Sequence, residues 1–143
     1  MIKRAKSVLF LPDNAGEIAF DTLLVKELQS LGKTVTVAVK NSPILNDATL
    51  NDAKEVGMDK VADGLMTIGT DSIGLLLDET SPEFREKLSK SDYLIAKGMA
   101  YYETLTEIKF NKPVACLLRA KCFPVAHSVG VAKGSNAALL LRK

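Results

Sequence analysis

The stretch "SVLFLPDNAGEIAF", residues 7–20, decides the fold because it joins two kinds of apolar pattern through a short polar loop. Residues 7–11 form a continuous apolar run, which is typical of a strand buried on both faces of a parallel sheet. From Glu17 onward, "EIAFDTLLVKELQSLG" places apolar side chains near helical spacing until Gly32, a residue type that commonly ends helices. The stretch therefore predicts a buried strand, a loop that begins at Pro12, and an amphipathic helix.

Strand and helix patterns alternate along the rest of the chain. This alternation predicts an α/β protein with a three-layer Rossmann-like fold, a mainly parallel sheet and helices on both faces. No repeat or linker interrupts it, so we expect residues 1–143 to form a single α/β domain with no preceding helical domain in this chain. The expected strands are 34–39, 65–68, 92–97 and 113–118, with 137–141 as a last strand or strand-like tail, and the expected helices are 47–56, 81–91 with Ser81 as N-cap, 101–110, and a short broken helix at 121–130.

Composition and charge narrow the classes of protein to consider. The net charge of +2, and the lack of a basic run interleaved with aromatic residues, argue against nucleic-acid binding. No apolar stretch approaches the roughly 20 residues needed to cross a bilayer, and the apolar part of the N-terminal segment is too short for a signal peptide. Only Cys116 and Cys122 are present, which argues against a disulfide framework and indicates a reducing cytoplasm.

Polar and glycine-containing loops follow the expected strands. In open parallel sheets, ligands bind beyond the carboxyl ends of the strands, so these loops should share one edge of the sheet. Each is rich in groups that hold a metal or a phosphate. The loops are "PDNAGE" (12–17), "KNSPILND" (40–47), "GTDSIG" (69–74), "KGMAYYE" (97–103) and "RAKC" (119–122).

Two interpretations compete for the acidic loop residues. Asn14 and Glu17 fit a capping box, with Asn14 as the N-cap and Glu17 returning the hydrogen bond. Asn46 or Asp47 could likewise cap the helix that follows. The capping interpretation leaves Asp13 unexplained, because this residue lies one position earlier, at the end of the strand.

A bound cation is the second interpretation. Adjacent parallel strands should bring Asp13 and Asp47 close together, and two carboxylates in one partly buried site repel unless one is protonated or a cation intervenes. Oxygen ligands without histidine favour Mg²⁺, Mn²⁺ or a similar hard ion over zinc. The single histidine, His127, is expected to pack or to lie at the surface.

Basic residues stand at the same predicted edge. Lys97 ends one expected strand, and Arg119 and Lys121 end or follow another. Such an arrangement suits the spread negative charge of a phosphate, although a single lysine past a strand is usually a solvated end. The "GTDSIG" loop could offer backbone N–H groups to a phosphate at a helix start, or could be a plain loop.

The segments "DNAGE", "FDTLLVKEL", "KNSPILNDAT", "AKGMAYYE" and "LLRAKC", in this order, resemble the damage-control phosphatase family, and the match runs from about Ser7 to Lys121 or beyond. This family was formerly a domain of unknown function and includes members once described as protein-carboxylate methyltransferases. The resemblance implies a Rossmann-like core and hydrolysis of small phosphomonoesters, such as sugar phosphates or damaged phosphometabolites. It also implies a divalent metal ion (Mn, Ni, Co or Mg) held by Asp13, Asn14 and Asp47.

The roles that follow from the resemblance can be assigned residue by residue. Asp13, Asp47 and Lys97 are the expected catalytic residues, with attack by a water activated at the metal or by Asp13 itself as covalent nucleophile. The haloacid-dehalogenase type of aspartyl phosphatase is disfavoured, because it requires a second aspartate where Ala15 stands. The expected substrate-binding residues are Glu17, Gly98, Tyr101, Glu103 and Lys121.

Two features depart from the family pattern. Tyr101 stands where the family usually carries an asparagine, which alters the hydrogen bonds offered to a substrate. Relatives also commonly carry a helical domain before the core, so this chain is a minimal form, a fragment, or one that borrows its cover by forming a homo-oligomer or binding a helical partner. The alternative functions are a non-catalytic metal- or phosphate-binding α/β module and a carboxylate methyltransferase, which "PDNAGE" disfavours because it has a single glycine.

Overall fold

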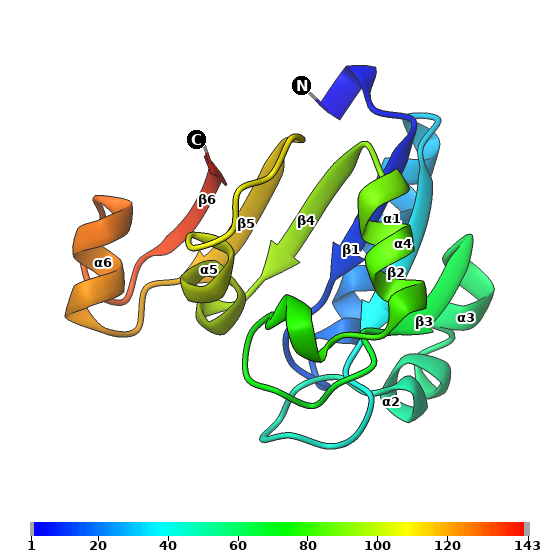
Figure 1. Ribbon diagram of the computed structural model, residues 1–143, viewed down its shortest axis with the longest axis horizontal. Coiled ribbons are helices and arrows are strands. Elements are labelled where there is room, and N and C mark those ends of the chain that lie inside the picture. The colour runs from blue at the N-terminus through cyan, green and yellow to red at the C-terminus, as the bar shows by residue number, and fades with distance from the viewer. Residues whose placement is uncertain (1, 142–143) are drawn as a thin grey trace.

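The computed structural model describes residues 2–141 and contains a six-stranded sheet in the order β3-β2-β1-β4-β5-β6 (Figure 1). The strands β1 to β5 pair in parallel, and β6 runs antiparallel to β5 at one edge. The strands are β1 (Ser7–Leu11), β2 (Thr34–Val39), β3 (Gly64–Thr67), β4 (Tyr93–Lys97), β5 (Val114–Arg119) and β6 (Asn136–Leu141); the helices are α1 (Ile18–Ser30), α2 (Leu50–Glu55), α3 (Met58–Val61), α4 (Pro82–Lys90), α5 (Met99–Leu105) and α6 (Phe123–Val129), with 3₁₀ turns η1 (Ile2–Arg4) and η2 (Leu77–Glu79).

The predicted mainly parallel α/β fold is confirmed, and several element bounds need correction. The helix predicted at 47–56 begins only at Leu50, because Thr49 and Asp52 form a capping box at its start; neither Asn46 nor Asp47 is the cap. The helix predicted at 101–110 begins earlier, at Met99, and ends at Leu105. Hydroxyl groups of Thr104 and Thr106 bond back to carbonyls within this segment, a contact that weakens continued helix.

Alternating side chains of the strands divide the core between the two faces of the sheet. Leu9 and Leu11 of β1 pack in the cluster that includes residues of α4, α5 and α6, whereas Val8 and Phe10 pack in the cluster that includes residues of α1, α2 and α3. Both clusters contain side chains with almost no exposed surface. The sheet is therefore the middle layer that the sequence predicts.

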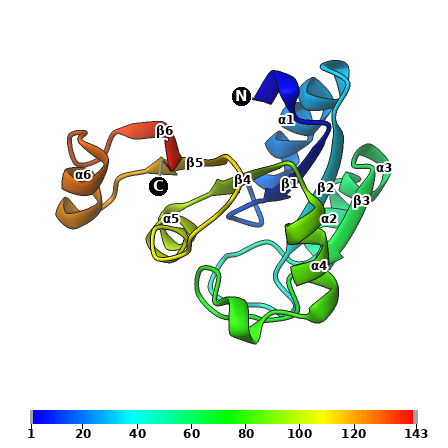
Figure 2. The ribbon, with the colours of Figure 1, turned by 45° about the horizontal axis from the view of Figure 1, so that its top comes forward.

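Helix cover is uneven on the face that carries α1. In Figure 2, α1 lies above β1 and β2, and α5 lies below β4 and β5. Above the other half of this face, side chains of β4, β5 and β6 line an open hollow rather than a helix interface. Its lining residues are Tyr93, Ala115, Leu117, Ala138, Leu139 and Leu140. Among the described residues no helix is long and apolar enough to cross a membrane.

Candidate active site

Backbone hydrogen bonds join the loop after β1 to the loop after β2. The N–H of Ala15 donates to the carbonyl of Asn46, and the N–H of Ala48 donates to the carbonyl of Asp13, each at 2.8 Å. Asn14 and Asp47 form an isolated antiparallel bridge between these bonds. The adjacent parallel strands thus bring Asp13, Asn14 and Asp47 together at the carboxyl edge of the sheet, as the strand-end argument predicts.

Asp13 lies at the centre of this group and carries an unfavourable charge. Burial, followed by the negative charges of Asp47 and Glu17, raises the pKa of its carboxyl to about 6. Gly98 packs directly against it: the backbone of Gly98 has φ +94°, and a Cβ atom at this position would lie 2.5 Å from Cγ of Asp13. A glycine is therefore required here both by the backbone conformation and by the close approach of the carboxylate.

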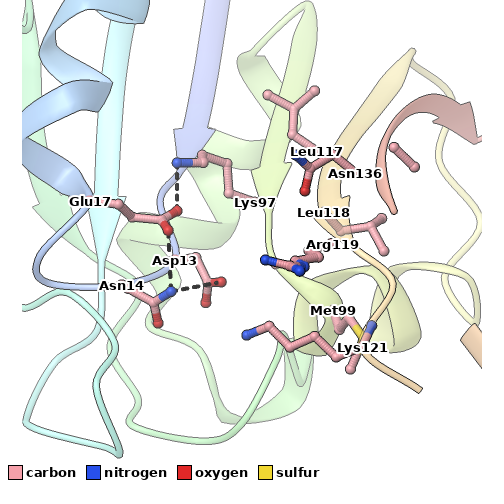
Figure 3. A pocket seen from close by; sticks show the side chains of 12 residues that line it. Asp13, Asn14, Glu17, Lys97, Met99, Leu117, Leu118, Arg119, Lys121 and Asn136 are labelled. Carbon is pink, nitrogen blue, oxygen red and sulfur yellow. Dashed lines mark hydrogen bonds and ion pairs between the residues drawn. The ribbon is translucent and has the colours of Figure 1, made fainter. Parts of the chain in front are cut away.

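Asn14 does not cap the first helix, so the predicted capping box is wrong. Glu17 is itself the N-cap residue of α1, without a capping side-chain bond. The amide nitrogen of Asn14 instead donates to Asp13 Oδ2 at 3.4 Å and to Glu17 Oε2 at 3.3 Å (Figure 3). This arrangement leaves the amide oxygen of Asn14 without a donor among residues 2–141.

The donor set fits a hard divalent cation. Asp13, Asn14 and Asp47 offer only oxygen atoms, and a cation would offset the mutual repulsion of the two carboxylates. Residues 2–141 contain no cluster of three or more His, Cys, Asp or Glu side chains that could hold a metal ion. A cation at this edge would therefore depend on the Asn14 amide as its third protein ligand. His127 is exposed on α6.

Lys97 forms two short ion pairs. Its Nζ lies 2.6 Å from Glu17 Oε1 and 2.6 Å from Asp21 Oδ1, and Asp21 is 4% exposed. Burial alone would lower the pKa of Lys97, but the hydrogen bonds that Lys97 donates to the two carboxylates outweigh this effect and raise the pKa. Asp21 is a site residue that sequence reasoning missed; its spacing of four residues from Glu17, which puts both on one helix face, is the signal that could have found it.

Lys40, at the end of β2, is a second missed residue. Its side chain is 2% exposed, and its Nζ donates to the carbonyls of Ser72 and Gly74 at 2.7 Å each and lies 3.9 Å from Asp47 Oδ2. These two carbonyls of the 69–74 loop thus accept hydrogen bonds from Lys40. No helix starts within this loop, so the suggested phosphate site of backbone N–H groups at a helix start is not present there. A lysine at the end of a buried strand was the available signal.

A pocket of about 370 Å³ opens beside these residues. Arg119 and Lys121 point into it from the side opposite Asp13 and Asn14 (Figure 3). Tyr101 is buried and Glu103 is exposed on α5, and neither lines the pocket. The lining residues are Asp13, Asn14, Glu17, Lys97, Gly98, Met99, Leu117, Leu118, Arg119, Lys121, Asn136 and Ala137.

A family model for the damage-control phosphatase ARMT1-like domain matches residues 1–137 of the chain. The chain belongs to the damage-control phosphatase family. This membership confirms the resemblance found in the loop segments, all of which lie within the matched residues.

Individual relatives match nearly the whole chain. The chain is 47% identical over 131 residues to a damage-control phosphatase of Archaeoglobus fulgidus, covering 92% of this chain and 45% of the relative. It is 47% identical over 139 residues to an uncharacterised protein of Methanocaldococcus jannaschii, covering 96% and 45%. The crystal structure of a DUF89 family protein from Pyrococcus horikoshii superposes with a TM-score of 0.87 at 39% identity, covering 94% of this chain and 47% of that one. The chain spans about half the length of the relatives it matches.

Proposed function

We propose that the chain is a metal-dependent phosphatase that hydrolyses small phosphomonoesters, such as sugar phosphates or damaged phosphometabolites. One observation carries the proposal: Asp13 and Asn14, which adjoin Asp47, face basic side chains across a single pocket. This is the charge arrangement that phosphoryl transfer requires, with a cation on one side of the phosphate and fixed positive groups on the other. Relatives that bear the name damage-control phosphatase support the same activity.

Asp13, Asn14 and Asp47 would hold a divalent cation, with Mn, Ni, Co or Mg as the candidates. When bound, such a cation supplies Lewis-acid charge stabilisation and lowers the pKa of water. The raised pKa of Asp13 fits this role, because burial and the neighbouring negative charges of Asp47 and Glu17 disfavour the ionised carboxylate. The positive charge of a bound cation would offset this penalty.

The basic residues of the pocket would bind the phosphate oxygens. Lys121 and Arg119 point into the pocket and can approach a phosphate directly. Lys97 has three N–H donors, and carboxylates of Glu17 and Asp21 accept from it at 2.6 Å, which leaves one donor for a substrate. Lys97 therefore combines a structural role with the proposed catalytic one. The attacking group is a water or the Asp13 carboxylate.

Phosphate release from a panel of phosphomonoesters tests the proposal. The chelator-treated chain should release phosphate only after addition of Mn²⁺, Ni²⁺, Co²⁺ or Mg²⁺. Asp13→Ala and Asp47→Ala should reduce release to the background and abolish thermal stabilisation by Mn²⁺, whereas Asp59→Ala, at an exposed position on α3, should behave as the wild type. If both site variants still gain stability from Mn²⁺, the cation binds elsewhere.

The second candidate is a non-catalytic module that binds a metal ion and a phosphate. The open half of the sheet favours it, because a site next to uncovered strands excludes less water, and charge interactions weaken in water. Mn²⁺ binding and phosphate binding without turnover on the panel would select this alternative.

We also infer that the uncovered half of the sheet is covered by a second copy or by a helical partner. A parallel sheet is normally packed on both faces, and the hollow over β4 to β6 is lined mainly by apolar side chains. The two cysteines are free, which fits a reducing compartment, and we propose a cytoplasmic location.

A further inference from the structure

Lys40 and Tyr101 form a buried pair that touches the proposed cation site and has no role in the proposed reaction. Nζ of Lys40 lies 4.6 Å from the centroid of the Tyr101 ring, and the same atom lies 3.9 Å from Asp47 Oδ2. Both side chains are 2% exposed. Lys40 is itself fixed by its bonds to the carbonyls of Ser72 and Gly74, so the ring of Tyr101 packs against a rigid charge.

The hydroxyl group of Tyr101 is buried and has no hydrogen-bond partner within residues 2–141. Such groups are rare in folded proteins, because an unpaired buried hydroxyl loses its bonds to water and gains nothing in return. The neighbouring Tyr102 shows the ordinary case, since its hydroxyl lies 2.7 Å from Ser128 Oγ. The unpaired hydroxyl therefore points to a partner that binds next to Tyr101.

Asp47 and Asp13 lie near enough to Tyr101 for their charges to act on its hydroxyl group. Burial raises the pKa of Tyr101 above its ordinary value, and the negative charges of Asp47 and then Asp13 raise it further. The phenol thus keeps its proton and can act only as a neutral donor or acceptor. Its position beside two acidic side chains favours donation to an oxygen.

We propose that the Tyr101 hydroxyl is a positioning group of the site formed by Asp13, Asn14 and Asp47. When a divalent cation is bound, this hydroxyl donates a hydrogen bond to an oxygen atom of one of the side chains that ligate the cation. Lys40 holds the ring in place for this contact. The inference rests on the proposed cation site. Groups that hydrogen-bond to metal ligands orient those ligands, and their loss typically weakens metal binding by about 10- to 100-fold.

Tyr101→Phe removes only the hydroxyl, and Tyr102→Phe on the same helix is the matched control. Isothermal titration of the chelator-treated chain with Mn²⁺ should give a dissociation constant about 10- to 100-fold higher for Tyr101→Phe, and an unchanged one for Tyr102→Phe. The metal-free Tyr101→Phe protein should melt at least about 2 °C higher than the wild type, because an unpaired buried donor has been removed. Tyr102→Phe should not melt higher, because it loses a bond to Ser128.

Near-ultraviolet absorbance gives a readout that a purely structural hydroxyl would not change. The chain has three tyrosines and no tryptophan, so its spectrum reports tyrosine alone. Addition of Mn²⁺ should shift the tyrosine band to longer wavelength in the wild type and in Tyr102→Phe, and should leave Tyr101→Phe without that shift.

Three results would overturn the inference: an unchanged Mn²⁺ dissociation constant for Tyr101→Phe, a lower melting temperature of the metal-free variant, or a Mn²⁺-induced tyrosine shift that persists without Tyr101. Asp47→Ala separates this failure from failure of the proposed function. If Asp47→Ala binds Mn²⁺ as the wild type does, or if the wild type binds none, the cation site itself is wrong and the inference falls with it.

Discussion

Asp21 and Lys97 form a partly buried ion pair at the edge of the pocket, so the proposed catalytic role of Lys97 is joined to a structural one. Asp21 is buried in the first turn of α1, and its second carboxylate oxygen has no partner among the described residues. The Nζ atom of Lys97 lies 2.6 Å from Oδ1 of Asp21 and neutralises the charge of this carboxylate. Lys97 also lines the pocket. A change at Lys97 should therefore affect both folding stability and catalysis, and the two effects can be separated.

Lys97→Ala should lower turnover by about 10²-fold, as expected for loss of a preorganised charge partner. It should also reduce the free energy of unfolding by about 3 kcal/mol, because a buried carboxylate loses its cation. Mn²⁺ affinity should change little. Urea unfolding and phosphate release measure the two effects.

The double variant Lys97→Ala/Asp21→Asn is the control, because the neutral amide removes the uncompensated charge. It should recover much of the lost stability without recovering turnover. Turnover that remains at the wild-type level in Lys97→Ala would reduce Lys97 to a structural partner of Asp21.

The residues that the sequence could identify are those whose position alone places them at the sheet edge. Asp13, Asn14 and Lys97 follow or end strands β1 and β4, and all three line the pocket. Asp21 could not be identified in this way because it lies within a helix, and Lys40, although it directly follows β2, resembles an ordinary solvated strand end. Their roles depend on contacts with residues 76 positions away for Asp21 and more than 30 away for Lys40.

At the scale of elements, one exposed carboxylate ties the beginning of β1 to the beginning of β4. Asp92 Oδ2 accepts hydrogen bonds from the backbone N–H groups of Lys6 and Ser7 at 2.9 Å each, and from the Ser7 hydroxyl at 3.0 Å. These bonds hold the pKa of Asp92 below its ordinary value, the backbone bond from Ser7 contributing most. This carboxylate therefore fixes the register at which two central strands start.

The pH dependence of this contact follows from the sign of the shift. A carboxyl whose pKa is lower in the folded state stabilises the fold above its unfolded pKa of about 3.9, and this contribution disappears as pH falls through the folded value. Asp92→Asn should therefore unfold at a lower urea concentration than the wild type at pH 7, and the difference should vanish near pH 2.

Asp59→Asn, on the exposed side of α3, is the matched control and should leave the urea midpoint unchanged. A gap between wild type and Asp92→Asn that stays constant down to low pH would show that the charge of Asp92 does not contribute.

Strands were easier to predict than helix ends. The bounds of β1 and β2 agree with their apolar and β-branched runs, because burial on both faces leaves a continuous pattern. The start of α5 could not be predicted from periodicity, since its N-cap residue is Gly98, whose backbone has φ +94° and packs against Asp13. Local pattern thus indicates the strands, whereas the start of this helix coincides with a tertiary contact.

At the scale of the whole molecule, the apolar patterns of the strands predict that both faces of the sheet are buried, whereas the described helices leave part of one face open. The sequences of β5 and β6, "VACLLR" and "NAALLL", are apolar on both faces. Within residues 2–141, α5 and α6 contribute to the core on one face, and the other face of these strands borders the open hollow. Phe20 and Leu23 on α1 are also exposed apolar side chains, at 74% and 64%.

This excess of apolar surface predicts that the chain self-associates or binds a helical partner. Sedimentation velocity at micromolar concentration should show a species larger than the monomer for the purified chain, unless the partner is a different protein. Ala138→Glu places a charge in the hollow without leaving a cavity, and should shift the chain toward monomer because burying an unpaired carboxylate is costly.

Ala132→Glu, in the exposed loop after α6, is the control and should not change the distribution of monomer and larger species. A chain that stays monomeric and still hydrolyses a phosphomonoester at ordinary rates would contradict the prediction. In that case the pocket alone excludes enough water for Asp13, Asp47 and Lys97 to act, and the hollow over β4 to β6 has no part in catalysis.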